Sequence, residues 1–329
     1  MHRTAKITKK IVIFAFAKIT TIMKRFLVTV IATAICSLVL AQDQWAVVNL
    51  SSNFMREDPD YAAENGDQAL MGTVVKVLDK SSYWLKIQSP EPYTAWATDM
   101  GLTLMTEEEK NAYIVAPKFI CTAEYTHVFS EPGIKAARVS DLVMGDLLLK
   151  TGKKRGSWTG VELPNGKKGW VKSCEIEDFA KWAATREVTG ENVEKIARKF
   201  IGVPYLWGGT SIKHVDCSGF SRSVFFMLGV LLPRNASQQA KVGEEVTREQ
   251  ARKGDLIFFG RSATEDKPER VSHVGIYLGD GKILHSSHLV RENSINKGDE
   301  GYYSGNILHF RRIIGHVDDG TGITSMLKS

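Results

Sequence analysis

The chain has 329 residues, of which 43% are hydrophobic, 24% charged and 9% aromatic. This length suggests two or three domains, and the composition excludes a disordered or collagen-like chain. The formal net charge of +6 does not predict a nucleic-acid partner, because seven of the 43 basic residues lie in residues 1–41 and the rest of the chain holds 36 basic and 37 acidic residues.

Residues 1–41 are predicted to be an export signal. The basic pair Lys24-Arg25 precedes an apolar run of 15 residues, which is followed by a small residue, Ala41. This run is shorter than a membrane span, so no stable span is expected. The mature chain is therefore predicted to start at Gln42 and to act in the periplasm or cell envelope, and Met23 is an alternative start of translation.

Residues 42–180 contain an internal duplication. Four residues recur 73 or 74 positions later: Pro59, Gly72, Trp84 and Trp96 return as Pro132, Gly145, Trp158 and Trp170. Short alternating runs, separated by turn residues, are typical of small antiparallel barrels. Strands are expected at residues 74–78, 84–87, 147–150 and 158–161. We predict two small β domains, at residues 45–112 and 113–180, with the tryptophans in their cores and rims.

From residue 186 the pattern changes to helices followed by strands. Thr189 is a predicted cap of a helix whose apolar residues are spaced three and four apart, and a second helix is predicted after Cys217. Strands are expected at residues 255–259, 273–278 and 283–285, with Asp280-Gly281 in a hairpin turn. Residues 186–316 are therefore predicted to form an α+β domain.

Cys217 lies immediately before or at the first turn of the second predicted helix, in the sequence Asp216-Cys217-Ser218-Gly219-Phe220. A helix N-terminus carries unpaired N–H groups and partial positive charge, which stabilise a thiolate and a developing oxyanion. A single cysteine is otherwise more often a small buried hydrophobe. Catalysis needs a base within hydrogen-bond reach of the thiol, and a third group that orients the base.

Histidines on the predicted hairpin offer both groups, in two alternative registers. If the turn has two residues, facing residue numbers sum to 561 and His273 lies opposite His288. If residues 279–281 form a three-residue loop, the sum is 560, and His285 lies opposite Gly275 on the face that carries His273. Glycines on both sides of Asp280 favour the second register, and with it His285.

Two of the remaining cysteines, Cys121 and Cys174, lie in the second predicted β domain. They either form a disulfide or are two buried thiols. The sequence contains no motif for a metal or a phosphate group, so no cofactor is expected.

Five motifs occur in one order over about 120 residues: Tyr205-Leu-Trp207-Gly208-Gly209, Asp216-Cys217-Ser218-Gly219-Phe220, Pro233-Arg234 with Ser237-Gln238-Gln239, Gly254-Asp255-Leu256-Ile257-Phe258-Phe259, and His273-Val-Gly275-Ile-Tyr277-Leu-Gly279. With them the domain resembles the NlpC/p60 superfamily of cell-wall cysteine peptidases, which have a papain-like core. By this resemblance Cys217 is the nucleophile, His273 the base and His285 the orienting residue.

The two β domains resemble the paired bacterial SH3-like barrels that precede this core in γ-D-glutamyl-diamino-acid endopeptidases. In such enzymes an acidic residue of the first SH3-like domain binds the free amino group of an L-Ala-γ-D-Glu-diaminopimelate stem peptide. The resemblance implies that Glu64 is this residue and Tyr93 its partner in the groove; the alternative is that both are ordinary surface residues. It also assigns substrate binding to five residues of the catalytic domain: Tyr205, at the oxyanion, Trp207, Asp216, Ser218 and Ser237.

These resemblances predict a cysteine endopeptidase that hydrolyses the γ-D-Glu to diaminopimelate bond of murein stem peptides through a Cys217 thioester. One alternative is an amidase or acyltransferase on the same core, which has no use for an amine-binding Glu64. Another is a cell-wall-binding protein without catalysis. Stem peptides are the expected partner, and the oligomeric state is left open.

Overall fold

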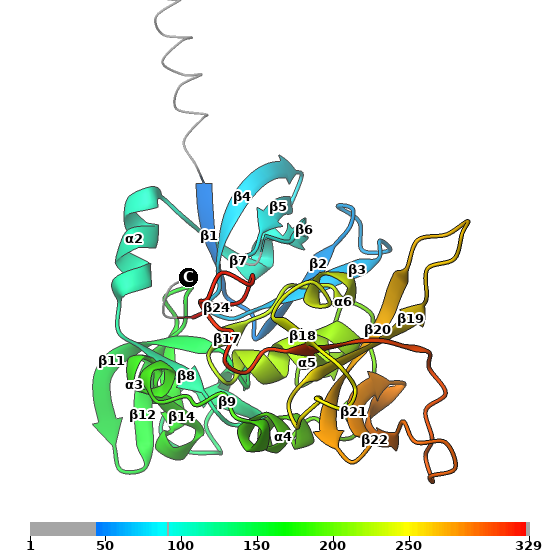
Figure 1. Ribbon diagram of the computed structural model, residues 1–329. Coiled ribbons are helices and arrows are strands. Elements are labelled where there is room, and N and C mark those ends of the chain that lie inside the picture. Colours follow the sequence, from blue (N-terminus) through cyan, green and yellow to red (C-terminus); the bar gives the residue numbers. More distant parts are fainter. Residues whose placement is uncertain (1–43, 91, 327–329) are drawn as a thin grey trace, which may run out of the picture. The chain divides into compact units, whose positions relative to one another are not determined.

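The computed structural model describes residues 44–90 and 92–326 (Figure 1). The predicted export signal lies outside these residues. Among the residues described, no helix is both long and apolar enough to cross a membrane.

The predicted duplication is present as two seven-stranded antiparallel sheets. Their strand orders are β3-β2-β6-β5-β4-β1-β7 and β10-β9-β13-β12-β11-β8-β14, so the second repeats the first with every label raised by seven. The first sheet contains β1 (Gln44–Val48), β2 (Ser52–Arg56), β3 (Asn65–Leu70), β4 (Val74–Ser81), β5 (Trp84–Gln88), β6 (Thr94–Thr98) and β7 (Leu102–Met105). The second contains β8 (Lys118–Cys121), β9 (Tyr125–Phe129), β10 (Arg138–Val143), β11 (Leu147–Arg155), β12 (Trp158–Glu162), β13 (Lys168–Lys172) and β14 (Ile176–Asp178).

Matching turns explain part of the repeated sequence. Gly72 and Gly145 precede β4 and β11 and have φ angles of 88° and 102°, in the left-handed region that favours glycine. Trp84 and Trp158 begin the next strand of each sheet. Trp84 is buried and Trp158 half-buried, in line with positions in the core and at the rim. Closure of each sheet into a barrel stays a prediction.

A helix that the sequence analysis missed joins the two sheets. In α2 (Glu107–Val115), Thr106 and Glu109 form a reciprocal capping box, which satisfies backbone N–H groups at the first turn. The helix is short and mostly polar, so it has no clear apolar stripe in the sequence. The predicted boundary between residues 112 and 113 falls inside it.

The third region has helices first and then an antiparallel sheet, as predicted for an α+β domain. Its helices are α3 (Phe179–Ala184), α4 (Gly190–Arg198), α5 (Cys217–Phe226) and α6 (Ala236–Gln239). The six-stranded sheet has the order β18-β23-β19-β20-β21-β22. These strands are β18 (Glu244–Val246), β19 (Leu256–Arg261), β20 (Arg270–Gly279), β21 (Lys282–Ser287), β22 (Leu289–Ser294) and β23 (Ile307–Arg312). Two short pairs complete the region: β15 (Thr210–Ser211) with β16 (His214–Val215), and β17 (Val230–Leu231) with β24 (Thr324–Ser325).

The two β domains also share a short turn of 3-10 helix. The turns η1 (Asp99–Gly101) and η2 (Ser173–Glu175) lie at equivalent positions in the two halves of the duplication.

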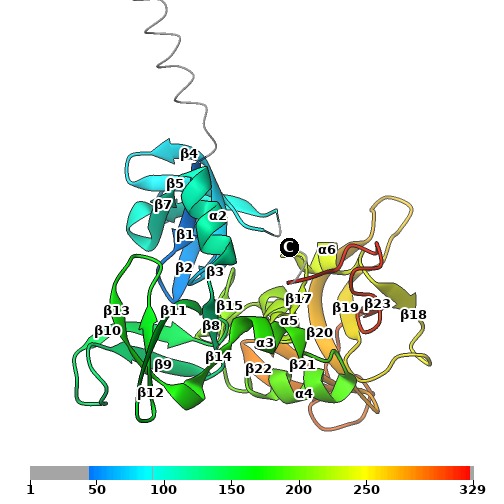
Figure 2. The same ribbon diagram turned by 90° about the vertical axis from the view of Figure 1, so that its left-hand side faces the viewer.

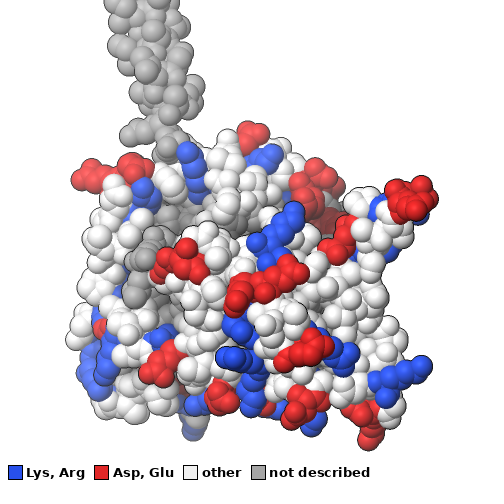
Figure 3. All heavy atoms as spheres, viewed as in Figure 1, with Lys and Arg blue, Asp and Glu red and all other residues white. Residues whose placement is uncertain are grey.

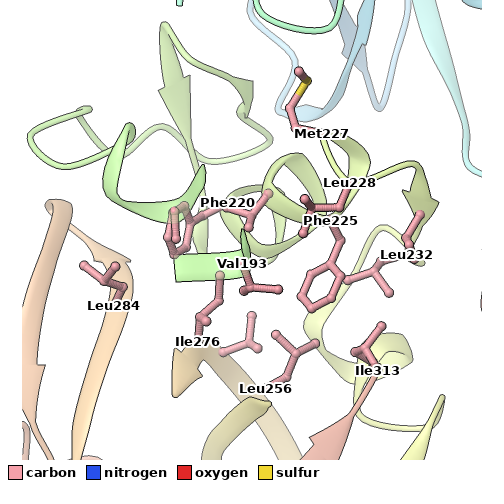
Figure 4. Packing of buried hydrophobic residues seen from close by; sticks show 14 of the residues in the cluster. Val193, Phe220, Phe225, Met227, Leu228, Leu232, Leu256, Ile276, Leu284 and Ile313 are labelled. Atoms are coloured by element: carbon pink, nitrogen blue, oxygen red, sulfur yellow. The ribbon is translucent and has the colours of Figure 1, made fainter. Parts of the chain in front are cut away.

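Helix α5 packs against β20 and β21 of the sheet (Figures 1 and 2), and an apolar core holds it there. Phe220 and Phe225 of α5 belong to the same buried cluster as Leu256 and Ile276 of the sheet (Figure 4). Burying one such side chain contributes about 1.5–3 kcal/mol. Because α5 is held along its apolar face, the position of its first residue, Cys217, is defined relative to β20.

The hairpin of β20 and β21 has the register that the sequence favoured, but the extra residue lies in the strand and not in the turn. Ile276 pairs with Leu284, so facing residue numbers sum to 560 along the strands, as expected. The turn itself has two residues, Asp280 and Gly281, both with positive φ, and Gly279 faces Lys282. A register shift between Tyr277 and Gly279 supplies the extra residue. The expected three-residue loop was therefore wrong, although the predicted register of the strands is confirmed.

On the face shown in Figure 3, basic and acidic side chains are interspersed, without a broad area of one sign. This mixture agrees with the near balance of charges counted beyond residue 41.

Candidate active site

Cys217 is the first residue of α5, and the helix cap holds it in place. Asp216 is the N-cap, and its Oδ1 accepts a hydrogen bond of 2.6 Å from the backbone N–H of Gly219. The backbone N–H of Val274 lowers the pKa of the thiol, so the Cys217 side chain lies beside β20, where Val274 follows His273. The Cys217 side chain is buried, and burial, followed by the charge of Asp216, raises its pKa to about 11. The resting thiol is therefore neutral near pH 7.

Two histidines and an asparagine form a hydrogen-bonded relay beside this thiol. Nε2 of His273 lies 2.8 Å from Nδ1 of His285, and Nε2 of His285 lies 2.8 Å from Oδ1 of Asn293. His285 is fully buried and faces Gly275, whose position leaves room for its side chain. His288, the alternative, is an exposed residue with a positive φ between β21 and β22.

The amide of Asn293 sets the proton positions along this relay. Its Nδ2 donates to the carbonyl oxygen of Gly301 at 2.6 Å, so its Oδ1 faces His285 as an acceptor. Nε2 of His285 must then carry a hydrogen, and in the neutral ring Nδ1 accepts. Nε2 of His273 is consequently the donor to His285, which leaves Nδ1 of His273 with a lone pair.

Both histidines of the relay have lowered pKa values, which favour their neutral forms. Burial lowers the pKa of His273 to about 3, with a smaller contribution from His285. Burial also lowers the pKa of His285, and the hydrogen bond that His285 donates to Asn293 opposes this by raising it. The site therefore holds a neutral imidazole next to a neutral thiol.

Two residues of this site were missed by the sequence analysis. Asn293 belongs to β22, which was not predicted, and its amide reaches His285 only through the strand register. Tyr303 packs its ring edge-on against His285, with 4.6 Å between centroids, and also contacts His273. Burial raises the pKa of Tyr303, and the charge of a Cys217 thiolate adds to this. Neither residue belongs to a local motif that reveals it.

The residues predicted to bind substrate differ in how they are held. Ser218 is buried, and its hydroxyl contacts Asp216 and Arg234. Tyr205 is half-buried; burial raises the pKa of its hydroxyl, with a further contribution from Cys217. Trp207 is 57% exposed, which favours a groove wall over a core position. Ser237 is exposed on α6.

In the first β domain, Tyr93 pairs with Glu57 and not with Glu64. The Tyr93 hydroxyl donates to Oε1 of Glu57 at 2.5 Å, and its pKa is raised by burial and by Glu57. Asp67 and Arg234 also act on this hydroxyl, so the pair lies near the catalytic domain. Glu64 is exposed. Its backbone oxygen accepts a hydrogen bond from the N–H of Glu57, and its carboxylate has no hydrogen-bond partner among the described residues. The carboxylate that lies beside Tyr93 is thus that of Glu57, where the resemblance implied Glu64.

The three described cysteines are free thiols. Cys121 and Cys217 are buried and Cys174 is exposed. Cys121 and Cys174 are therefore separate thiols, and the alternative of two buried thiols holds for Cys121 but is wrong for Cys174. Among residues 44–90 and 92–326 no group of three His, Cys, Asp or Glu side chains is placed to hold a metal ion.

Parts of this chain are similar to known proteins. Residues 202–312 match the NlpC/P60 family, and residues 50–101 match the bacterial SH3 domain. A γ-D-glutamyl-L-lysine dipeptidyl-peptidase of Bacillus cereus is 29% identical over 238 residues, which are 69% of this chain and 69% of that protein. Dipeptidyl-peptidase 6 of Lysinibacillus sphaericus is 28% identical over 77% of this chain and 91% of its own length.

The fold has a solved counterpart. The crystal structure of an NlpC/P60 family protein from Bacillus cereus superposes with a TM-score of 0.69 at 23% identity, over 82% of this chain and 99% of that one. The two sheets, the helix that starts at Cys217 and the sheet that carries both histidines therefore form a known arrangement. The chain contains an NlpC/P60 peptidase domain preceded by a bacterial SH3 domain.

Proposed function

We propose that this protein is a cysteine endopeptidase of the cell envelope, which hydrolyses the bond between γ-D-Glu and the diamino acid in murein stem peptides. The observation that carries the proposal is that a helix-starting cysteine lies beside β20, the strand of His273, whose imidazole is linked by hydrogen bonds to His285 and through it to Asn293. The names of the B. cereus and L. sphaericus relatives, both dipeptidyl-peptidases, support the substrate class.

The reaction starts with a proton transfer from the thiol. Nδ1 of His273 takes the proton of Cys217 while the sulfur attacks the γ-carbonyl carbon of D-Glu. The negative charge on the carbonyl oxygen is stabilised by the N-terminus of α5, with the Tyr205 hydroxyl as a second donor. The tetrahedral species then expels the amine of the diamino acid, which receives the proton from Nδ1 of His273.

The remaining thioester is hydrolysed by water. Nδ1 of His273 takes a proton from this water, whose oxygen attacks the thioester carbonyl, and returns it to the sulfur as Cys217 leaves. During both steps the imidazolium form of His273 is stabilised through His285, which is held by Asn293. His285 and Asn293 thus orient the base and share its charge.

The direct test is mass spectrometry of defined stem peptides after incubation with the purified protein. From L-Ala-γ-D-Glu-diaminopimelate-D-Ala we expect two products, the dipeptide L-Ala-D-Glu and diaminopimelate-D-Ala. A second digest uses muropeptides that still carry muramic acid on L-Ala; cleavage of these only at the amide between muramic acid and L-Ala would support the amidase alternative. Binding to peptidoglycan without any cleavage would support a non-catalytic wall-binding protein.

The lowered pKa of His273 predicts an unusual acid limb in the pH profile. The base works only when unprotonated, so activity is lost as pH falls through its pKa, and this loss is expected well below the ordinary histidine value near 6.5. Asn293→Asp puts a carboxylate beside His285, which stabilises the protonated relay and moves the acid limb upward by about one pH unit. The profile of kcat/KM from about pH 2 to 8 measures this.

Arg291→Gln is a matched test that leaves the relay intact. Arg291 is exposed, lies opposite His285 in the strand pair and lowers the pKa of that histidine. Its removal should move the acid limb in the same direction as Asn293→Asp, but by less. If neither variant moved the limb, His273 and His285 would not be the groups that titrate.

A further inference from the structure

Asp67, on β3 of the first β domain, is a fully buried carboxylate held by two arginines of the catalytic domain. Nη1 of Arg222, on α5, lies 3.0 Å from both of its oxygens. Nε of Arg234 lies 2.8 Å from Oδ1, at an angle that makes this an ion contact and not a directed hydrogen bond. A buried carboxylate is costly unless it is paired, so these contacts tie the first β domain to the catalytic domain.

Arg234 also contacts Asp216, the residue that precedes the nucleophile. Its Nη2 lies 2.6 Å from Oδ2 of Asp216, and its Nη1 lies 3.1 Å from the Ser218 hydroxyl. Arg222, Asp67, Arg234 and Asp216 thus alternate in sign, and the two positive charges balance the two negative ones. Removal of one member leaves a buried charge without its counterpart.

Asp216 in turn determines the local backbone around Cys217. Its Oδ1 caps the helix at Gly219, and its Oδ2 accepts from the backbone N–H of Gly208 at 2.9 Å. One carboxylate therefore aligns the start of α5 with the loop that carries Trp207. Without Asp67, the buried Arg234 has Asp216 as its remaining carboxylate partner, and its stronger attraction to that carboxylate draws the Asp216 oxygens away from the helix cap.

Neighbouring residues of β3 bind the same loop. Asn65 donates to the Trp207 carbonyl at 3.1 Å. The side-chain oxygen of Gln68 accepts from the Thr210 backbone at 2.9 Å, and its backbone oxygen accepts from the Thr210 hydroxyl at 2.9 Å. The strand with Asp67 is therefore part of the support of the nucleophile loop.

We infer that Asp67 is a positioning residue, which acts through Arg234 and Asp216 to hold the Cys217 sulfur in line with His273. The active site is then complete only when the first β domain is docked. This inference rests on the proposed catalytic function, but its main readout, the reactivity of the Cys217 thiol, needs no peptide substrate.

The experiment compares Asp67→Asn with wild type in the full chain. The rate of Cys217 alkylation by iodoacetamide, followed by peptide mass spectrometry so that the exposed Cys174 does not interfere, should fall at least tenfold at pH 7. The kcat for a stem peptide should fall on the order of a hundredfold, as a displacement of about 1 Å typically causes, with a smaller change in KM. If the wild type were alkylated at Cys217 but cleaved no stem peptide, the proposed function would fail while the alkylation comparison would still test the inference.

Asp141→Asn is the matched control for domain docking. Asp141, in the second β domain, lies 2.6 Å from Nζ of Lys213 in the catalytic domain, but this pair does not lead to Asp216. Its removal should leave alkylation and kcat within about twofold of wild type. An equal loss in both variants would make domain docking in general, and not Asp67, responsible.

The double variant Asp67→Asn/Arg222→Gln separates positioning from charge burial. It restores the charge balance, because Arg234 then pairs with Asp216 alone, so it is expected to fold even if Asp67→Asn does not. Its alkylation rate and kcat should stay low, and Asp67→Glu should recover part of both. Wild-type alkylation and kcat in the double variant would overturn the inference.

Discussion

Cys217→Ala is expected to abolish hydrolysis of stem peptides without unfolding the chain. The substitution removes only a sulfur atom at the start of α5, so it leaves a small cavity and keeps the apolar face of the helix intact. Without a nucleophile no thioester forms, and kcat should fall by at least about a thousandfold. Release of dipeptide, followed by chromatography, measures kcat, and circular dichroism checks the fold.

His273→Ala should cause a loss of similar size, since it removes the only ring nitrogen that the relay leaves free to accept the thiol proton. His285→Ala should retain more activity, because orientation contributes less than proton transfer. Cys174→Ala is the matched cysteine control; its thiol is exposed in the second β domain, and turnover should be unchanged. Turnover by Cys217→Ala above a hundredth of wild type would contradict the proposed mechanism.

The elements of the catalytic domain that depend on neighbouring residues were predictable. The Thr189 cap was expected, and its hydroxyl accepts from the backbone of Asn192. The start of α5 at Cys217 was also expected, because capping and apolar spacing are local signals. The register that brings His285 to His273 followed from the glycines of the turn, although the extra residue is in the strand and not in the loop.

The parts of the site that depend on distant contacts were not predictable. Asn293 meets His285 through the pairing of β21 with β22, and Tyr303 reaches both histidines from beyond the last of these strands. Asp67 lies 149 positions before Asp216 in the sequence and is joined to it only through Arg234. One sequence contains no periodicity that reports such contacts between domains. The choice between Glu57 and Glu64 as the amine-binding carboxylate likewise depends on a distant contact, because Tyr93 lies 36 positions from Glu57 in the sequence.

Glu57→Gln should reduce the preference of the enzyme for substrates with a free amino terminus. The carboxylate of Glu57 is exposed and oriented by the Tyr93 hydroxyl, so it is available to a cationic amine in the groove. An amine bound there without a negative partner is desolvated at a cost. We expect the wild type to prefer L-Ala-γ-D-Glu-diaminopimelate over its N-acetylated form, and Glu57→Gln to lower the ratio of the two kcat/KM values by about tenfold or more.

Glu64→Gln is the control that decides between the two carboxylates, because both are exposed and lie in the same hairpin of β2 and β3. If Glu57 binds the amine, Glu64→Gln should keep the wild-type ratio, and Tyr93→Phe, which frees Glu57 from its hydroxyl partner, should lower the ratio by less than Glu57→Gln. If Glu64→Gln alone removed the preference, the resemblance would have identified the correct residue and the Tyr93 pair would be incidental. Equal cleavage of both peptides by the wild type would contradict amine recognition altogether. An enzyme without this requirement acts on intact murein, whereas one with it needs an amidase to release the stem peptide first.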